Sequence, residues 1–151
     1  MKNIFKGIAA FLLLSLAACN FQKKDNQKPD ENRFTPVVLT AEGDFDEPMS
    51  FEVMKDGKVY ISERKGNLKV FDPITKMVSI VGTIPVNTKY TSAEGVVSEA
   101  EEGFMGFTVD PNFEKNHFAY LYYAHPTIAK HILTRWELVN DKLVAGSEKV
   151  L

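Results

Sequence analysis

The pattern M-x-F-x-V occurs twice in this sequence, and the interval between the copies constrains the fold more than any other feature. PMSFEV occupies residues 48–53 and FMGFTV occupies residues 104–109, so Met49, Phe51 and Val53 recur 56 positions later, since 105 − 49 = 56. Such a spacing is typical of a repeated supersecondary unit that packs on its neighbour. We therefore expect two similar units in succession.

Short β-strand patterns joined by turn residues fill the first unit. The turns are predicted at Asp56-Gly57, at Gly66 and at Asp72-Pro73, where glycine and proline favour tight reversals of the chain. The strands between them are expected at residues 48–54, 58–63, 67–72 and 76–82. Four consecutive strands joined by tight turns form an antiparallel meander, which is the blade of a β-propeller.

The second unit repeats this plan with longer connections. Its strands are expected at residues 103–110, 117–124 and 131–138, with the start of a fourth at 148–151, and a long loop at 85–102 links the two units. The fold class is thus all-β, with about the first two four-stranded blades of a propeller. Because propellers close with about four to eight blades, we expect an N-terminal fragment of a longer protein. A small two-sheet sandwich or an open barrel is the alternative.

The N-terminal residues have the layout of an export signal. Lys2 and Lys6 precede an apolar run, and Leu16-Ala17-Ala18-Cys19 resembles a bacterial lipobox, in which the cysteine is lipidated after cleavage. This predicts a lipoprotein signal peptide at residues 1–18 and a flexible, polar tether at 19–34, before a folded domain at 35–151. A plain signal peptide with an incidental cysteine is the alternative. The expected location is outside the inner membrane, on the periplasmic side or the cell surface.

Charge and cysteine content exclude several classes of function. The 18 Lys and Arg are interspersed with 20 Asp and Glu, so the basic stripe that nucleic-acid binding requires is missing from the sequence, and we expect no nucleic-acid partner. Cys19 is the only cysteine, which rules out a disulfide within the chain. The three histidines have no metal-ligand spacing, and we expect no metal site in these residues.

Propeller topology assigns the loops to two faces. What we call the top face collects residues 45–47, 63–64, 85–102 and 124–130, and the bottom face collects residues 56–57, 72–73 and 111–112. Long loops on a rigid scaffold carry function more often than short turns. Candidates near a cofactor or substrate are therefore Glu101 and Glu102, directly before the innermost strand of the second unit, and His125. A solvated acidic loop and a turn histidine are the structural alternatives.

Two segments resemble the soluble quinoprotein glucose and sorbosone dehydrogenases. DGKVYISERKGNLKVFD is similar to the first blade of that family, in which a strand ends in Glu-Arg with a glycine two residues later, here Glu63, Arg64 and Gly66. EEGFMGFTVDPNFEKNHFAYLYYA is similar to the family's G-L-L-G stretch followed by D-P-x-F. Its counterparts here are Gly103, Gly106, Asp110 and Pro111, and Phe104 and Met105 replace the leucines.

This resemblance implies a six-bladed propeller that binds pyrroloquinoline quinone (PQQ) and calcium on its top face and oxidises a sugar. The implied chemistry is hydride transfer from a CH–OH group to the quinone, with electrons passed to a periplasmic acceptor such as a cytochrome. The family's catalytic histidine comes after Leu151, so no catalytic residue is assigned and the fragment alone is expected to be inactive. The glucose enzymes have a Gln near the position of Glu101. Glu63 and Arg64 are interpreted as structural.

Two other classes of function stay open. A propeller of the same fold that binds carbohydrate or protein without catalysis is the main alternative, because fold does not determine function. A free-standing lipoprotein adaptor of two β-units is the other. A His followed by glycines beyond Leu151 would favour the enzyme.

Overall fold

The computed structural model describes residues 30–151, which divide into two units at Val37/Val38. The described part of the first unit holds only a short 3₁₀-helix, η2 (Glu31–Arg33), and the second unit holds every strand. The predicted signal peptide at 1–18, Cys19 and most of the predicted tether at 19–34 lie outside the described residues. Among residues 30–151 no helix has the length and apolar character needed to cross a membrane.

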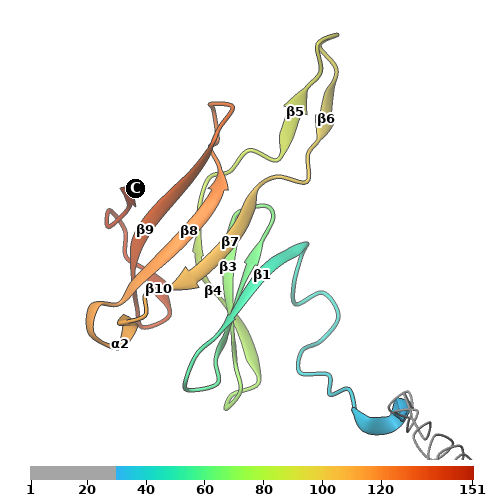
Figure 1. Cartoon of the computed structure of the whole chain (residues 1–151), viewed down its shortest axis with the longest axis vertical. Coiled ribbons are helices and arrows are strands. Elements are labelled where there is room, and N and C mark those ends of the chain that lie inside the picture. The colour runs from blue at the N-terminus through green and yellow to red at the C-terminus, as the bar shows by residue number, and fades with distance from the viewer. Residues whose placement is uncertain (1–29) are drawn as a thin grey trace, which may run out of the picture. The chain divides into compact units, whose positions relative to one another are not determined.

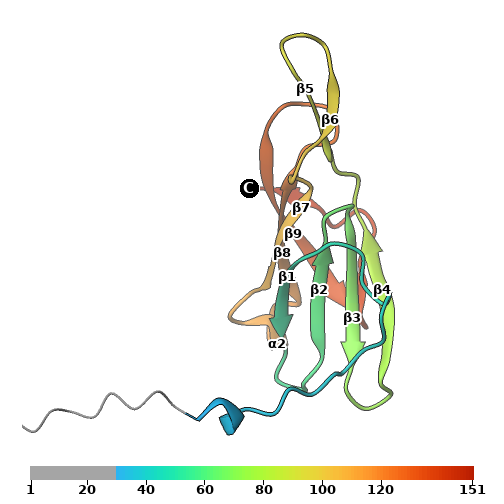
Figure 2. The same cartoon turned by 90° about the vertical axis from the view of Figure 1, so that its right-hand side faces the viewer.

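The first sheet is the predicted four-stranded meander. Its strands are β1 (Pro48–Val53), β2 (Val59–Glu63), β3 (Asn67–Asp72) and β4 (Met77–Thr83), antiparallel and in sequence order (Figure 2). At the predicted hairpin turn Gly57 has φ of 85°, and the Met54 N–H donates to the Lys58 carbonyl at 2.8 Å. The prediction for the first unit is confirmed strand by strand.

The long connection between the sheets is a hairpin, so the prediction of a loop over residues 85–102 was wrong. Strand β5 (Lys89–Thr91) pairs with β6 (Val97–Glu99), and the hairpin extends beyond both sheets in Figure 1. Ser92 closes its turn, because its N–H donates to the Val96 carbonyl and its hydroxyl accepts from the backbone N–H groups of Glu94 and Val96. The tyrosine, threonine and valine in these short strands are good β-formers.

The second sheet also follows the prediction, with additions. It contains β7 (Phe104–Val109), β8 (Phe118–Ala124), β9 (His131–Val139) and β10 (Lys142–Leu143), and β11 (Lys149–Val150) pairs with β9 as the expected start of a fourth strand. The turn between β7 and β8 contains a single helical turn, α2 (Phe113–Asn116). His117 ends α2 in the left-handed conformation, with φ of 54°, so the strand begins one residue later than expected.

One hydrophobic core joins the two sheets. Tyr60 of β2 stacks on Phe107 of β7 with 5.6 Å between ring centroids, and Phe104 meets Tyr123 edge to face at 6.5 Å. Each fully buried side chain of this size contributes about 1.5–3 kcal/mol to folding. The buried members of the core come from both sheets and from Ile84, directly after β4: Tyr60, Leu68, Val70, Val81, Ile84, Phe104, Phe107, Ala119, Leu121, Tyr123 and Leu138.

The two copies of M-x-F-x-V lie on neighbouring inner strands but differ in burial. Phe107 is 6% exposed, whereas the equivalent Phe51 is 70% exposed. The strands β1 and β7 lie side by side, since the Ser50 hydroxyl accepts a hydrogen bond from the Phe107 N–H at 3.1 Å (Figure 1). The second copy is therefore packed between the two sheets, while within residues 30–151 the first copy faces solvent.

Candidate functional site

The side chain of Arg64 joins three segments of the top face. Its guanidinium binds both carboxylate oxygens of Glu47, with the closest pair 2.9 Å apart, and donates to the Ala100 carbonyl at 2.7 Å. It also lies 3.5 Å from the Glu99 carboxylate. Such bidentate arginine–carboxylate contacts fix orientation as well as charge. Arg64 thus holds the base of the β5–β6 hairpin against the turn that follows β2.

The backbone of Arg64 continues this connection into the second sheet. The Phe104 N–H donates to the Arg64 carbonyl at 2.9 Å, and a Cβ at Gly103 would lie 2.1 Å from that oxygen. Gly103 has φ of 145°. Only glycine fits both the conformation and the close approach of the two chains. Glu101 and Glu102 therefore occupy a short segment anchored at Ala100 and again at Gly103–Phe104.

Glu63 is buried beside Arg64 and binds different partners. Its carboxylate accepts hydrogen bonds from the Asp46 N–H at 2.8 Å and the Asn67 amide at 3.0 Å, and it lies 2.7 Å from the Lys69 ammonium. Burial alone would raise the pKa of Glu63, but these donors outweigh burial and hold the pKa below its usual value. The residue is ionised at neutral pH and its contacts lie within the first sheet and the segment before it.

Glu101 lines a hollow of about 410 Å³ on the top face, which we call the Arg64 hollow. The other lining residues are Glu47, Pro48, Met49, Arg64, Glu99 and Ala100. Glu101 is exposed, so its carboxylate is free to accept hydrogen bonds from a polar ligand. The structure places this candidate between the inner strand β1 and the hairpin, next to the paired guanidinium of Arg64.

Glu102 and His125 lie in other hollows, so the three candidates do not share one site. The Glu102 carboxylate is 3.4 Å from Nε2 of His131, and both line a hollow beside the β5–β6 hairpin. Nδ1 of His125 accepts the backbone N–H groups of Thr127 and Ile128 at 3.2 Å each. His125 consequently stabilises its own loop, and its ring borders a third hollow with Tyr123 and Glu148.

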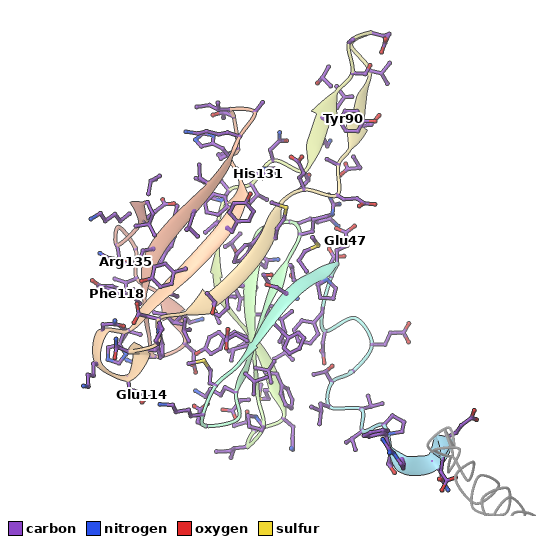
Figure 3. All side chains as sticks on the ribbon, in the orientation of Figure 1. Glu47, Tyr90, Glu114, Phe118, His131 and Arg135 are labelled. Carbon is purple, nitrogen blue, oxygen red and sulfur yellow. The ribbon has the colours of Figure 1, made fainter. Side chains whose placement is uncertain are left out.

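The remaining signature residues shape the second sheet. A β-bulge between Phe104 and Gly106 interrupts the pairing of β7 with β8. Asp110 accepts the Asn112 N–H at 2.8 Å and the Tyr120 hydroxyl at 2.7 Å, and these bonds hold the pKa of its carboxyl low. Pro111 lies exposed in the same turn. At that end of the sheet the Arg135 guanidinium lies 4.0 Å from the centre of the Phe118 ring (Figure 3).

Sequence reasoning missed a polar junction on the bottom face. Asp141, in the turn between β9 and β10, binds the Lys58 ammonium at 2.6 Å and the Tyr60 hydroxyl at 2.5 Å, so it ties the second sheet to β2 of the first. Burial, followed by the bond to Asp141, raises the pKa of Tyr60 far above its usual range. Asn140 and Asp141 both have positive φ in this turn, 50° and 56°, and nothing in the sequence indicated which residues the turn would contact.

The Arg64 hollow does not by itself fit an anionic quinone, and the described residues form no cluster that fits a metal ion. PQQ is a polycarboxylate and needs cationic partners, whereas the guanidinium in the Arg64 hollow is already engaged by Glu47 and Glu99. Within the described residues no cluster of three or more His, Cys, Asp or Glu side chains could hold a metal. No step of quinone or calcium chemistry is therefore assigned to these residues.

Comparison with known sequences gives a match to one protein family. The glucose/sorbosone dehydrogenase family profile matches residues 45–151, which is more than half of the chain. No match to a curated protein was found.

Comparison with solved structures shows the fold. The PQQ-bound aldose sugar dehydrogenase of Streptomyces coelicolor superposes with a TM-score of 0.56 at 15% identity, covering 78% of this chain and 32% of that one. The apo-form soluble aldose sugar dehydrogenase of Escherichia coli gives 0.57 at 17% identity, covering 76% and 31%. An oxidoreductase of Thermus thermophilus, described as a glucose dehydrogenase, gives 0.58 at 17% identity, covering 74% and 30%.

These likenesses decide between the architectures that the sequence left open. The two sheets are blades of a β-propeller, and the prediction of this fold is confirmed over a sandwich or an open barrel. The chain spans about a third of the length of the solved structures that it matches.

Proposed function

Because the chain belongs to the glucose/sorbosone dehydrogenase family, we propose that it supplies the first two blades of a propeller that oxidises a sugar with PQQ. The observation that carries this proposal is the family match over residues 45–151, which includes both blades and the top-face segment between them. The PQQ-bound state of the Streptomyces coelicolor relative supports the choice of cofactor. A third of a propeller is not expected to catalyse the reaction alone.

The reaction of the complete propeller removes two electrons from a CH–OH group of the sugar. PQQ, when bound, would supply the hydride acceptor for this oxidation, and the base for the hydroxyl proton would come from outside residues 30–151. Calcium would accompany the cofactor in this proposal, and a periplasmic electron carrier such as a cytochrome would take up the electrons. The cationic groups that bind the cofactor belong to other blades.

The part of the described residues in this reaction is to position the sugar. Glu101, exposed in the Arg64 hollow, is placed to accept a hydrogen bond from a sugar hydroxyl. Arg64 holds the segment that carries Glu101 by its bonds to Glu47 and the Ala100 carbonyl. Positioning of this kind lowers the entropic cost of reaching the reactive geometry.

A dye-reduction assay tests the proposal. The propeller that contains these blades is incubated with PQQ and Ca²⁺, and reduction of an artificial acceptor is followed with aldoses as substrates. We expect PQQ-dependent reduction that saturates with sugar, and Glu101→Ala should raise KM by more than it lowers kcat, because removal of the acceptor loses a contact made already in the ground state. Ile74→Ala, at the β3–β4 turn on the bottom face, is the control and should leave both constants unchanged. A folded propeller that binds sugar but reduces no dye would support the non-catalytic carbohydrate-binding alternative instead.

We also propose that the protein is exported and anchored to a membrane through a lipid on Cys19, at the periplasmic side or the cell surface. The support is the sequence pattern of residues 1–19, which lies outside the described part of the chain. Mass spectrometry of the detergent-extracted protein tests this. We expect an N-terminal peptide that begins at a lipid-modified Cys19, and an unmodified peptide that retains residues 1–18 would refute the anchor.

A further inference from the structure

The β5–β6 hairpin projects from the top face and carries exposed apolar side chains. Figures 1 and 2 both show it extending beyond the two sheets, and Figure 3 shows Tyr90 on it. Within residues 30–151 its apolar side chains are uncovered, with exposed fractions of 54% for Tyr90, 59% for Val96 and 60% for Val97. Apolar side chains that gather on one projecting element are typical of a surface that another molecule covers.

Hydrogen bonds hold the hairpin in a defined shape. A hairpin with strands of three residues has little stability of its own in water. At the turn the Ser92 N–H donates to the Val96 carbonyl at 2.9 Å. At the base the Ala100 N–H donates to the Thr88 carbonyl at 2.8 Å, and the Arg64 guanidinium donates to the Ala100 carbonyl at 2.7 Å. The tip is thus preformed, and a partner that binds there pays a small entropic cost of ordering.

Acidic side chains surround the apolar ones. The segment 85–102 contains four glutamates and a single lysine, so its net charge is −3. Glu94 lies exposed in the turn and has no ion pair among residues 30–151, while Glu99 is exposed at the end of β6. An apolar centre with a charged rim is typical of protein interfaces. A partner with a basic surface is favoured, whereas a second copy of this acidic hairpin is repelled.

The hairpin stands beside the segment that we assign to the sugar. Glu99 of β6 lines the Arg64 hollow together with Glu101. A protein docked on the hairpin therefore lies next to the place where the complete propeller would oxidise its substrate. Electron-transfer complexes are small and bury less than about 1,200 Å² in total, so one projecting hairpin offers a large part of the contact that such a complex needs.

We propose that the β5–β6 hairpin is the docking surface for a c-type cytochrome whose haem edge is surrounded by lysines. This inference rests on the proposed function, which requires a carrier for the electrons of the sugar. Each CH–OH group that is oxidised to C=O gives up two electrons and two protons. Two ferric haems are each reduced to the ferrous state by one electron, and the protons pass to solvent. The tyrosine and valines contact the apolar surface at the haem edge, and the glutamates attract the lysines around it.

Binding of the ferric cytochrome tests the docking surface without any sugar oxidation. The complete propeller is titrated with a lysine-rich c-type cytochrome by calorimetry, at low and at physiological ionic strength. We expect binding that weakens as salt screens the charges. Glu94→Lys should weaken it about tenfold at low ionic strength, and Val97→Ser should weaken it about fivefold at both. Glu114→Lys, the same charge reversal at an exposed glutamate of α2, is the matched control and should bind as the wild type does.

Three results of these titrations would overturn the docking surface. They are an absence of cytochrome binding, equal weakening by Glu94→Lys and Glu114→Lys, and full binding by both hairpin variants. Sedimentation of the propeller alone tests the other occupant of the hairpin. A dimer that Val97→Ser dissociates would show that a second copy covers this surface, and it would also overturn the proposal.

Turnover separates this inference from the proposed function. With sugar and PQQ present, Glu94→Lys should lower the rate constant for cytochrome reduction about tenfold, while reduction of a small artificial dye stays unchanged because the dye needs no docking surface. Unchanged reduction of both acceptors would refute the docking surface and leave the dehydrogenase activity standing. Cytochrome binding that depends on the hairpin, without any dye reduction, would support the docking surface and refute the dehydrogenase activity.

Discussion

Glu63 shows how one buried side chain organises the top face of the first blade. It is 1% exposed, and its carboxylate is bound by the Lys69 ammonium, the Asn67 amide and the Asp46 N–H. A buried charge without partners would be strongly unfavourable, so the carboxylate and its donors must be kept together. The backbone before β1 is thereby fixed to the end of β2, where Arg64 follows.

Replacement of Glu63 by glutamine should destabilise the protein. We expect Glu63→Gln to lower the free energy of unfolding by about 3 kcal/mol, because the Lys69 ammonium loses its buried counter-charge. Urea denaturation at pH 7 measures this loss. Glu114→Gln, at an exposed glutamate of α2, is the matched control and should change the free energy by less than about 0.5 kcal/mol. Equal stability of the two variants would contradict the role given to Glu63.

Wild type and Glu63→Gln, compared over a range of pH, test the direction of the pKa shift of Glu63. The pKa of Glu63 in the folded state lies below its ordinary value of 4.5, so its ionised form contributes stability above that value. This contribution is lost as the pH falls through the folded pKa. The stability difference between wild type and Glu63→Gln should therefore shrink as the pH falls below 4.5. A difference that grows in acid would show that the folded pKa is raised instead.

At the scale of single residues, the sequence indicated which positions are important, but it did not indicate which residues they contact. Glu63, Arg64 and Gly103 stand out because they belong to the two segments that resemble the glucose and sorbosone dehydrogenases. The partners of Arg64 at Glu47 and Glu99 lie 17 and 35 positions away, and only the folded chain brings them together. Asp141 gave no signal because its partners, Lys58 and Tyr60, lie in the other blade.

At the scale of elements, the two inner strands β1 and β7 are equivalent by sequence but occupy different environments. Phe107 packs on Tyr60 inside the interface between the blades, while Phe51 is exposed on β1. A propeller blade buries both faces against its neighbours. We infer that the exposed face of β1 is the position where a further blade packs in the complete ring.

Two matched substitutions, at Phe107 and Phe51, test whether a further blade packs on β1. In the chain of 151 residues, Phe107→Ala should lower the free energy of unfolding by roughly 3–4 kcal/mol, because it leaves a cavity in the core. Phe51→Ala should change it by less than about 0.5 kcal/mol, since the side chain already faces solvent. In the complete propeller both substitutions should be costly. A similar small effect of Phe51→Ala in the complete propeller would contradict a blade at this face.

Strands could be predicted where glycine or proline marks the turns between them, and they were missed where the strands are short. Asp56-Gly57 and Asp72-Pro73 separated the strands of the first blade correctly, because these residues restrict the backbone directly. The β5–β6 hairpin was missed because its strands have three residues each and an acidic, polar surrounding sequence. Its pairing depends on the turn at Ser92–Gly95 and on the anchor at Arg64, neither of which has a clear pattern in the sequence.

At the scale of the whole molecule, the fold was more predictable than the site. Repeat spacing and strand count indicated a propeller, and the family signatures indicated sugar oxidation, because both depend on local patterns. The candidates Glu101, Glu102 and His125 border three separate hollows, and the β5–β6 hairpin, which the sequence did not reveal, lines the first two. The guanidinium of Arg64, which lines the hollow beside Glu101, is already paired with Glu47 and is not free to bind an anionic cofactor.

The most direct test of the account is a crystal structure of the complete propeller with PQQ bound. We expect a further blade on the face of β1, with Phe51 buried to the level of Phe107, and the quinone on the top face beside the segment that carries Glu101. Phe51 exposed in a closed ring, or the quinone bound on the bottom face near Asp56, would contradict it.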